Sequence, residues 1–144
     1  MRRPDLSQCR LLPLIGHSAG ASTLIPLEQG GALPFVLKRS FFVHGARANE
    51  FRGGHANAVT TEALICVQGT VTATLDDGDH AGSFLLDAPN VALIISPMIW
   101  VDLHIHTDNA ILLACTDTSW AEAALAYYRE RDAWERALEH CAAA

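Results

Sequence analysis

Short apolar runs that alternate with clusters of turn residues fill the chain between positions 34 and 116. The runs are rich in Val, Ile, Leu, Thr and Phe, and Gly, Pro, Asn and Asp separate them, which is typical of β-strands joined by tight turns. Asp77 and Gly78 form an Asp-Gly pair that suits a hairpin. Seven or more antiparallel strands at this spacing predict a β-sandwich or barrel. The expected strands are 35–43, 62–68, 70–75, 82–86, 92–95, 100–106 and 110–115.

After Thr116 the sequence pattern changes from that of strands to that of a helix, because apolar and charged side chains recur there at helical spacing. Thr118 or Ser119 can cap this helix, with Glu122 in its first turn. The 144 residues suffice for one sizeable core and not for two. We therefore predict a single domain over 1–144, with N-terminal strands in 1–33, a barrel over 34–116 and a helical segment over 117–141.

The amino-acid composition argues against some classes of binding partner. The formal net charge is −6 and the chain has ten Lys and Arg residues, which disfavours nucleic acid and anionic membranes as partners. No apolar run approaches the roughly 20 residues of a membrane span, and the first residues lack the pattern of a signal peptide. The expected location is cytoplasmic. Cys66 and Cys115 lie inside apolar runs, so we expect buried free thiols.

The residues that could take part in binding or catalysis cluster in the sequence around one histidine. His55 and Asn57 are two positions apart, and Glu62 and Gly69 follow them. Residues two apart on a strand point to the same face, so His55 and Asn57 can share an interior face. This spacing resembles the first cupin motif, in which alternate side chains of one strand point into a barrel. The fold class that we predict is all-β, a cupin or double-stranded β-helix (jelly-roll barrel) with a C-terminal helical segment.

A second resemblance covers almost the whole chain. The ordered motifs PFVLKRSFFV, RGGHAN, TEALICVQGTVTATLDDG, SPMIWVDLH and LLACTDTSW are similar to those of the sugar-nucleotide 3,4-ketoisomerases, the WxcM-like cupins. Members of that family move a keto group between neighbouring carbons of a dTDP-linked 6-deoxysugar in deoxysugar biosynthesis. The resemblance implies acid-base catalysis without a metal or other cofactor. It also implies a homodimer in which N-terminal strands are exchanged between subunits.

The resemblance assigns roles to individual residues. His55 is the expected catalytic residue, and no residue is assigned to a metal. The arginines suit a diphosphate, because the guanidinium group presents forked donors. Each assignment has a structural alternative: His55 held by backbone groups, the arginines solvated, Glu62 paired with a base, and Trp100 filling the core. The expected substrate-binding residues are Arg39, Arg52, Gly53, Asn57, Glu62 and Trp100.

Several proton-carrying positions of the family are altered. Phe41 stands where the family has a tyrosine, Asn57 replaces a second histidine, and Val101 and Asp102 replace a His-Glu pair. A keto shift needs groups that remove and return protons near the working pH, which Phe and Asn cannot do. Two interpretations stay open. The chain is either an isomerase with His55 as its base or a catalytically impaired relative that binds a nucleotide sugar.

A metal-dependent cupin is a further alternative. Asp102, His104 and His106 alternate along one expected strand and, with His55 and Glu62, provide enough nitrogen and oxygen donors for a metal. Asn57 is a poor ligand at the position where a metal cupin has its second histidine. We therefore expect a site without metal.

Overall fold

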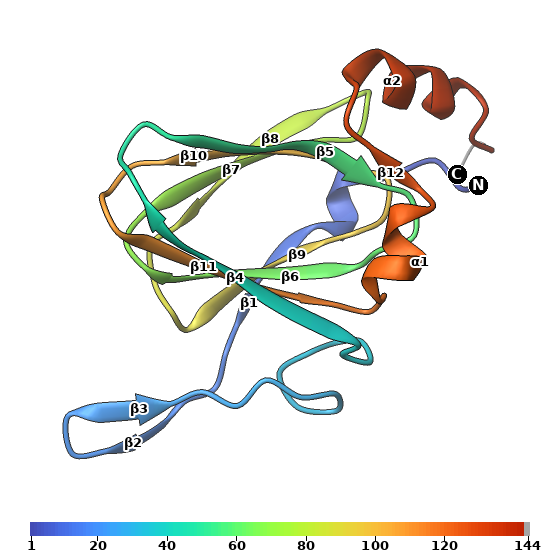
Figure 1. The fold of residues 1–144 in the computed structure, drawn as a ribbon. Coiled ribbons are helices and arrows are strands. Elements are labelled where there is room, and N and C mark those ends of the chain that lie inside the picture. Colours follow the sequence, from blue (N-terminus) through green and yellow to red (C-terminus); the bar gives the residue numbers. More distant parts are fainter. Residues whose placement is uncertain (143–144) are drawn as a thin grey trace.

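The computed structural model describes residues 1–142, which form two five-stranded antiparallel sheets that face each other as a barrel (Figure 1). The first sheet has the order β1 (Arg10–Pro13), β9 (Val91–Ile95), β6 (Glu62–Gln68), β11 (Ala110–Thr116) and β4 (Arg39–Ala46). The second has the order β12 (Tyr127–Tyr128), β5 (Phe51–Asn57), β10 (Trp100–Ile105), β7 (Val71–Asp76) and β8 (Ala81–Leu86). The remaining elements are β2 (His17–Ala19), β3 (Ser22–Leu24), the 3-10 helix η1 (Leu6–Gln8), α1 (Trp120–Ala124) and α2 (Arg131–Glu139).

Alternation along the strands builds the core between the sheets. In β7, Val71, Ala73 and Leu75 are fully buried, whereas Thr72 and Thr74 lie on the outer face. Successive side chains of a strand point to opposite faces, so this sequence presents one apolar face to the barrel interior. The all-β barrel predicted from the sequence is confirmed. All seven expected strands are present, 62–68 with its predicted bounds and the other six with shifted ends.

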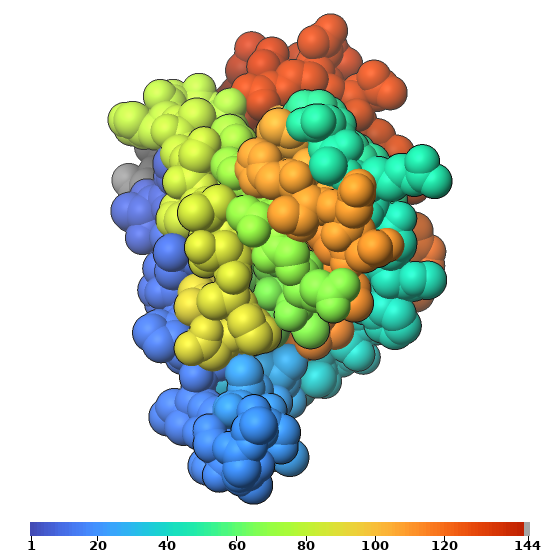
Figure 2. Space-filling view, turned by 90° about the vertical axis from the view of Figure 1, so that its left-hand side faces the viewer, coloured from blue at the N-terminus to red at the C-terminus, as the bar shows by residue number. Residues whose placement is uncertain are grey.

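The N-terminal segment covers the outer face of the first sheet. Leu14 and Leu33 pack there against Ile65, Ile94 and other buried side chains. The strand β1 joins the edge of the same sheet by pairing with β9. The hairpin of β2 and β3 stands away from the barrel, as Figures 1 and 2 show, and its Leu24 is 64% exposed.

The C-terminal segment differs from the single helical stretch expected over 117–141. Ser119 caps the short helix α1 in a capping box with Glu122. Then Tyr127 and Tyr128 form β12, which extends the second sheet by pairing with β5, before α2 begins. The free edge of β5 offers unpaired backbone groups, and pairing with them outweighs the helical pattern of these residues. Leu125, at the end of α1, is 91% exposed.

The helix α2 packs on the outer face of the second sheet. Trp134 is fully buried against Trp100, Met98 and Leu138, and its Nε1 donates to the Met98 carbonyl at 2.8 Å. Cys66 and Cys115 are buried and free, which confirms the prediction from their apolar surroundings. None of the helices in residues 1–142 has the length and apolar character to span a membrane.

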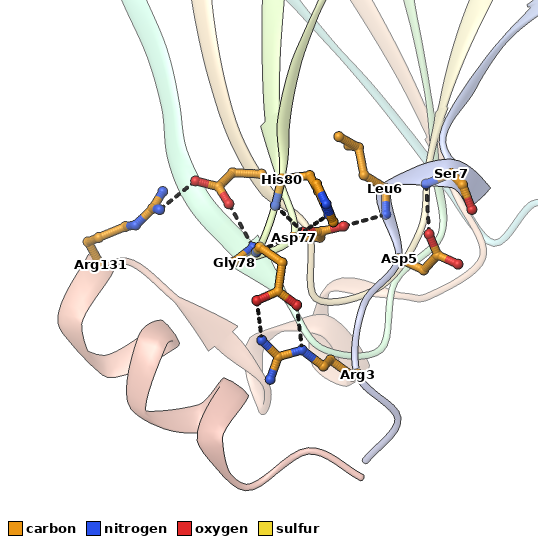
Figure 3. A network of polar contacts seen from close by, with 10 residues as sticks. Arg3, Asp5, Leu6, Ser7, Asp77, Gly78, His80 and Arg131 are labelled. Atoms are coloured by element: carbon orange, nitrogen blue, oxygen red, sulfur yellow. Dashed lines mark hydrogen bonds and ion pairs between the residues drawn. The ribbon is translucent and has the colours of Figure 1, made fainter. Parts of the chain in front are cut away.

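A polar network joins both ends of the chain to the turn between β7 and β8 (Figure 3). The buried carboxylate of Asp77 accepts from the backbone N–H groups of Leu6, Asp79 and His80 at 2.7–2.9 Å. Burial raises the pKa of Asp77, but these hydrogen bonds outweigh it and leave the pKa below its usual value. Ion pairs of Arg3 with Asp79 and of Arg131 with Asp76 flank this carboxylate.

Replacing Asp77 with alanine is expected to lower the free energy of unfolding by about 2–4 kcal/mol, because three backbone donors lose their acceptor. Asp79→Ala, which removes an exposed ion pair, is expected to cost at most about 1 kcal/mol. Because folding lowers the pKa of Asp77, its contribution is present above the unfolded pKa and is lost as the pH falls through the folded value. Denaturant unfolding of both variants checks this, and equal losses would contradict it.

Candidate functional site

A cavity of about 460 Å³ opens at the end of the barrel where α1 and β12 lie. Both sheets contribute to its walls, and so do Trp120, Ala123 and Tyr127 from the C-terminal segment. This volume suits a small organic ligand. Its apolar lining consists of Phe41, Val43, Leu64, Leu103, Leu112 and Ala114, and its polar lining includes Arg39, Arg52, His55, Asn57, Thr60 and Glu62.

Arg39 and Glu62 reach the cavity from the first sheet. Arg39 on β4 and Glu62 on β6 are both paired with Thr116 on β11, the strand between them. Residues paired across antiparallel strands point to the same face, so all three side chains face the interior. Burial raises the pKa of Glu62 to about 7, against the opposing effect of the Arg39 charge.

The guanidinium of Arg39 is oriented by aromatic rings. It lies 4.8 Å from the ring centroid of Phe41 and 5.3 Å from that of Trp120. Its Nε is buried and finds no hydrogen-bond partner within residues 1–142. Buried polar groups are normally satisfied by a protein group or by something bound. Arg39 is therefore poised to donate to an anionic ligand in the cavity.

A β-bulge turns Arg52 and His55 to the same side of β5. His55 pairs with Val101 and Arg52 with Leu103, and the register shifts between these two pairs. Residues three apart on a regular strand would point to opposite faces, but the extra residue of the bulge restores a common face. Gly53 and Gly54 form it with φ of 81° and 66°. The bulge thus brings Arg52 into the cavity beside His55.

His55 stacks on Tyr127, with ring centroids 4.9 Å apart. Burial is the main cause that lowers the pKa of His55, and the nearby Arg129 lowers it further. A hydrogen bond to the Gly53 backbone and the charge of Asp102 act in the opposite direction. The imidazole is consequently neutral near pH 7 and can accept a proton.

Asn57 faces the cavity, but most of its amide is engaged within the fold. Its Nδ2 donates to the Ala123 carbonyl at 2.9 Å, and its Oδ1 accepts from the backbone N–H groups of Val59 and Thr60 at 3.0 and 3.1 Å. One amide hydrogen remains for a ligand. The side chain expected to bind substrate instead fastens the loop after β5 to α1.

Trp100 lies outside the cavity, contrary to the substrate-binding role expected for it. Val101 faces inward opposite His55, so alternation turns Trp100 outward. Its ring packs against Trp134 at 5.5 Å, and its Nε1 donates to Asp102 at 3.0 Å. Trp100 therefore belongs to the core beneath α2.

The ligands considered for a metal are divided between two faces of the second sheet. His55 faces the cavity, whereas His104 stacks on Phe51 at 4.5 Å on the outer face and His106 bonds to Thr72 at 2.7 Å. Asp102 also lies outside. Within the part of the chain that the structure describes, no three His, Cys, Asp or Glu side chains are grouped as a metal site.

Reasoning from the sequence missed two aromatic residues of the cavity. Trp120 flanks Arg39 and Tyr127 stacks on His55, but both were assigned only to the helical segment expected over 117–141. The adjacent Tyr127 and Tyr128 were the available signal, because paired aromatic residues favour strands over helices. The remaining expected residues, Arg39, Arg52, Gly53, His55, Asn57 and Glu62, all line the cavity.

Comparison with known proteins identifies the family of this chain. The family model FdtA, described as WxcM-like, C-terminal, matches residues 7–139. The TDP-4-oxo-6-deoxy-alpha-D-glucose-3,4-oxoisomerase of Aneurinibacillus thermoaerophilus is 26% identical over 114 residues, which are 79% of this chain and 81% of the relative.

Two solved structures show the same architecture. A 3,4-ketoisomerase from Helicobacter canadensis superposes with a TM-score of 0.85 at 26% identity, covering 91% of this chain and 97% of that one. The WlaRB TDP-quinovose 3,4-ketoisomerase from Campylobacter jejuni gives a TM-score of 0.82 at 28% identity, covering 89% and 97%.

Proposed function

This chain belongs to the WxcM-like family that the FdtA model describes, and from that membership we propose that it is a sugar-nucleotide 3,4-ketoisomerase acting on a TDP-linked 4-keto-6-deoxyhexose. One observation carries the proposal: a single cavity holds two arginines and a neutral histidine. The arginines suit a diphosphate and the histidine suits proton removal. The names of the similar proteins supply the TDP-sugar as the substrate class.

Arg39 and Arg52 would hold the diphosphate. They enter the cavity from opposite sheets, so an anion between them meets guanidinium donors from two sides. Arg39 is already oriented by Phe41 and Trp120 and has an unsatisfied donor. Little side-chain ordering is then required on binding, which favours affinity.

His55 would carry the proton between the two sugar carbons. The keto shift removes a proton from the carbon beside the carbonyl, passes through an ene-diol, and returns a proton to the former carbonyl carbon. A base with a pKa near or below the working pH is suited to the first step, and the same group in its protonated form serves the last. The neutral His55 on the cavity wall meets both requirements.

A catalytically impaired binding protein is the second candidate function. Phe41 lines the cavity without an acid-base group, and the Asn57 amide is mostly engaged with the backbone. In this case the arginines would bind the nucleotide sugar, while no proton transfer would follow. Turnover by the wild-type protein would eliminate this candidate.

We also propose a homodimer in the cytoplasm. The hairpin of β2 and β3 projects from the barrel with Leu24 exposed (Figure 1). Ile15 just before it and Val36 and Phe42 after it are exposed as well. Apolar groups outside the core are typical of interfaces between subunits. Light scattering of the full chain measures the oligomeric state, and a monomer at all concentrations would contradict this part of the proposal.

Calorimetric titration with TDP, followed by incubation with TDP-4-keto-6-deoxyglucose in deuterium oxide, tests the function. Saturable binding and deuterium at the sugar carbons, observed by NMR, are the expected results. Binding of TDP without deuterium uptake or isomerisation would favour the impaired binding protein. Absence of TDP binding would refute both candidates.

A further inference from the structure

We propose that Glu62 is the second proton carrier of this site and exchanges protons with the two sugar oxygens, while His55 exchanges protons with the two carbons. The inference rests on the proposed keto shift and assigns the proton transfers that His55 alone leaves without a carrier. It gives a chemical role to a carboxyl group in a site where Phe41 and Asn57 carry no acid-base group.

Glu62 and His55 approach the cavity from opposite sheets. Glu62 begins β6 in the first sheet and His55 lies near the end of β5 in the second. Both side chains line the main cavity and also an adjoining hollow of about 30 Å³, together with Thr60. A sugar ring placed between the sheets would therefore have one group on each side.

The Glu62 carboxylate is open to a ligand. Within residues 1–142, no hydrogen bond or ion pair engages it, and its neighbours in the strand row do not offer one. Thr116 donates its hydroxyl to the carbonyls of Arg39 and Thr118, at 3.3 and 2.9 Å, and Ile95 on the other side is apolar. The half-buried side chain lines the cavity, so a ligand there can reach the carboxyl without displacing a partner within the fold.

The surroundings bring the pKa of Glu62 close to neutral pH, so that the protonated and ionised forms are both present. Burial raises its pKa to about 7, and the Arg39 charge on β4 acts in the opposite direction. The other titratable groups in its environment are His55 on β5, Cys115 on β11 and Tyr127 on β12. Burial is the main cause that raises the pKa of Cys115 and Tyr127, and Glu62 contributes to both. The same barrel thus holds a neutral base and a partly protonated acid, a pairing typical of acid-base sites.

The two groups together balance the reaction. Neutral His55 takes the proton from C3 as the Glu62 carboxyl donates its proton to the C4 oxygen, which forms the ene-diol. The Glu62 carboxylate then takes the proton from the C3 oxygen, the C3 carbonyl forms, and protonated His55 returns its proton to C4. Both residues end in their starting states, and no oxidant, reductant or other reactant is consumed.

The variant Glu62→Gln tests this role, because glutamine keeps the size of the side chain and cannot release a proton at neutral pH. We expect kcat to fall about 100-fold to 10,000-fold, with KM within about threefold of wild type because the arginines still hold the diphosphate. The wild-type rate should decline as the pH rises through about 7, where Glu62 ionises, and this limb should be absent in E62Q. Glu50→Gln, on an exposed turn outside the cavity, is the matched control and should leave both constants unchanged.

The outcomes separate this inference from the proposed function. Wild-type turnover with kcat of E62Q within about threefold of it would overturn the role of Glu62 and leave the isomerase intact. A wild-type protein that binds TDP without turnover would overturn the isomerase, and the role of Glu62 with it.

If E62Q does not fold, measurements on the wild-type protein test the role of Glu62 instead. An infrared carboxyl signal that titrates together with the fall in kcat near pH 7 supports the inference. A rate independent of pH from about 6 to about 8 overturns it.

Discussion

Replacing His55 with glutamine is expected to abolish deuterium uptake into the sugar and to lower kcat at least about 1,000-fold. Glutamine preserves much of the side-chain volume and can still form hydrogen bonds, but it cannot accept a proton from carbon. Affinity for TDP should stay within about threefold of wild type, because Arg39 and Arg52 are unaltered. Calorimetry with TDP and NMR of the sugar in deuterium oxide measure the two effects separately.

The control for His55→Gln is His106→Gln, on the outer face of the second sheet, where either side chain can bond to Thr72. This control should behave as wild type. Because burial lowers the pKa of His55, the wild-type rate should reach its acid-side midpoint below about pH 6.5, the usual value for histidine. H55Q with a rate within about tenfold of wild type would show that another group is the base.

Gly53→Ala is expected to reduce the free energy of unfolding by about 2–4 kcal/mol. Gly53 has a φ of 81°, and a Cβ at this position would lie 2.6 Å from the backbone oxygen of Val101. Neither atom can move without separating β5 from β10, which are paired on both sides of the bulge. Loss of the bulge would also turn Arg52 out of the cavity, so affinity for TDP should decrease along with stability.

Gly45→Ala separates conformational strain from steric conflict. Gly45 has a φ of 72° in β4, but nothing lies within 4 Å of a Cβ built there. We expect this control to cost about 1 kcal/mol, the penalty for placing alanine at positive φ. Denaturant unfolding of the two variants measures the difference. Equal losses would mean that the steric conflict with Val101 adds nothing to the cost of placing alanine at positive φ.

The strands with apolar alternation could be predicted, whereas β5 could not be located by the same pattern. β7 follows a strict alternation of buried and half-buried residues, which is a local property. β5 reads FRGGHAN, with two glycines and only one large apolar side chain, Phe51, which is 70% exposed. The motif spacing still placed His55 and Asn57 on one face, because that argument needs only the period of a strand.

The C-terminal segment shows the opposite case, in which a local pattern misled. Residues 120–128 have helical spacing, but α1 ends at Ala124 and Tyr127 joins the sheet beside Asn57. The unpaired edge of β5 decided this, and that edge exists only once the barrel has formed. Tyr127 was missed for the same reason, and Trp100 was misplaced because its inward neighbour Val101 is identified only by pairing with His55.

The amino-acid sequence by itself determined which residues alternate along the strands and that one barrel forms, because spacing along a strand is a local property. Its resemblance to a known family pointed to His55, Glu62 and the two arginines as site residues. Tertiary structure decided which groups remain free to react. Strand pairing and burial lowered the pKa of His55, raised that of Glu62, engaged the Asn57 amide and left the Arg39 Nε without a partner. The physical reason is that desolvation and hydrogen-bond satisfaction depend on neighbours that are distant in the chain.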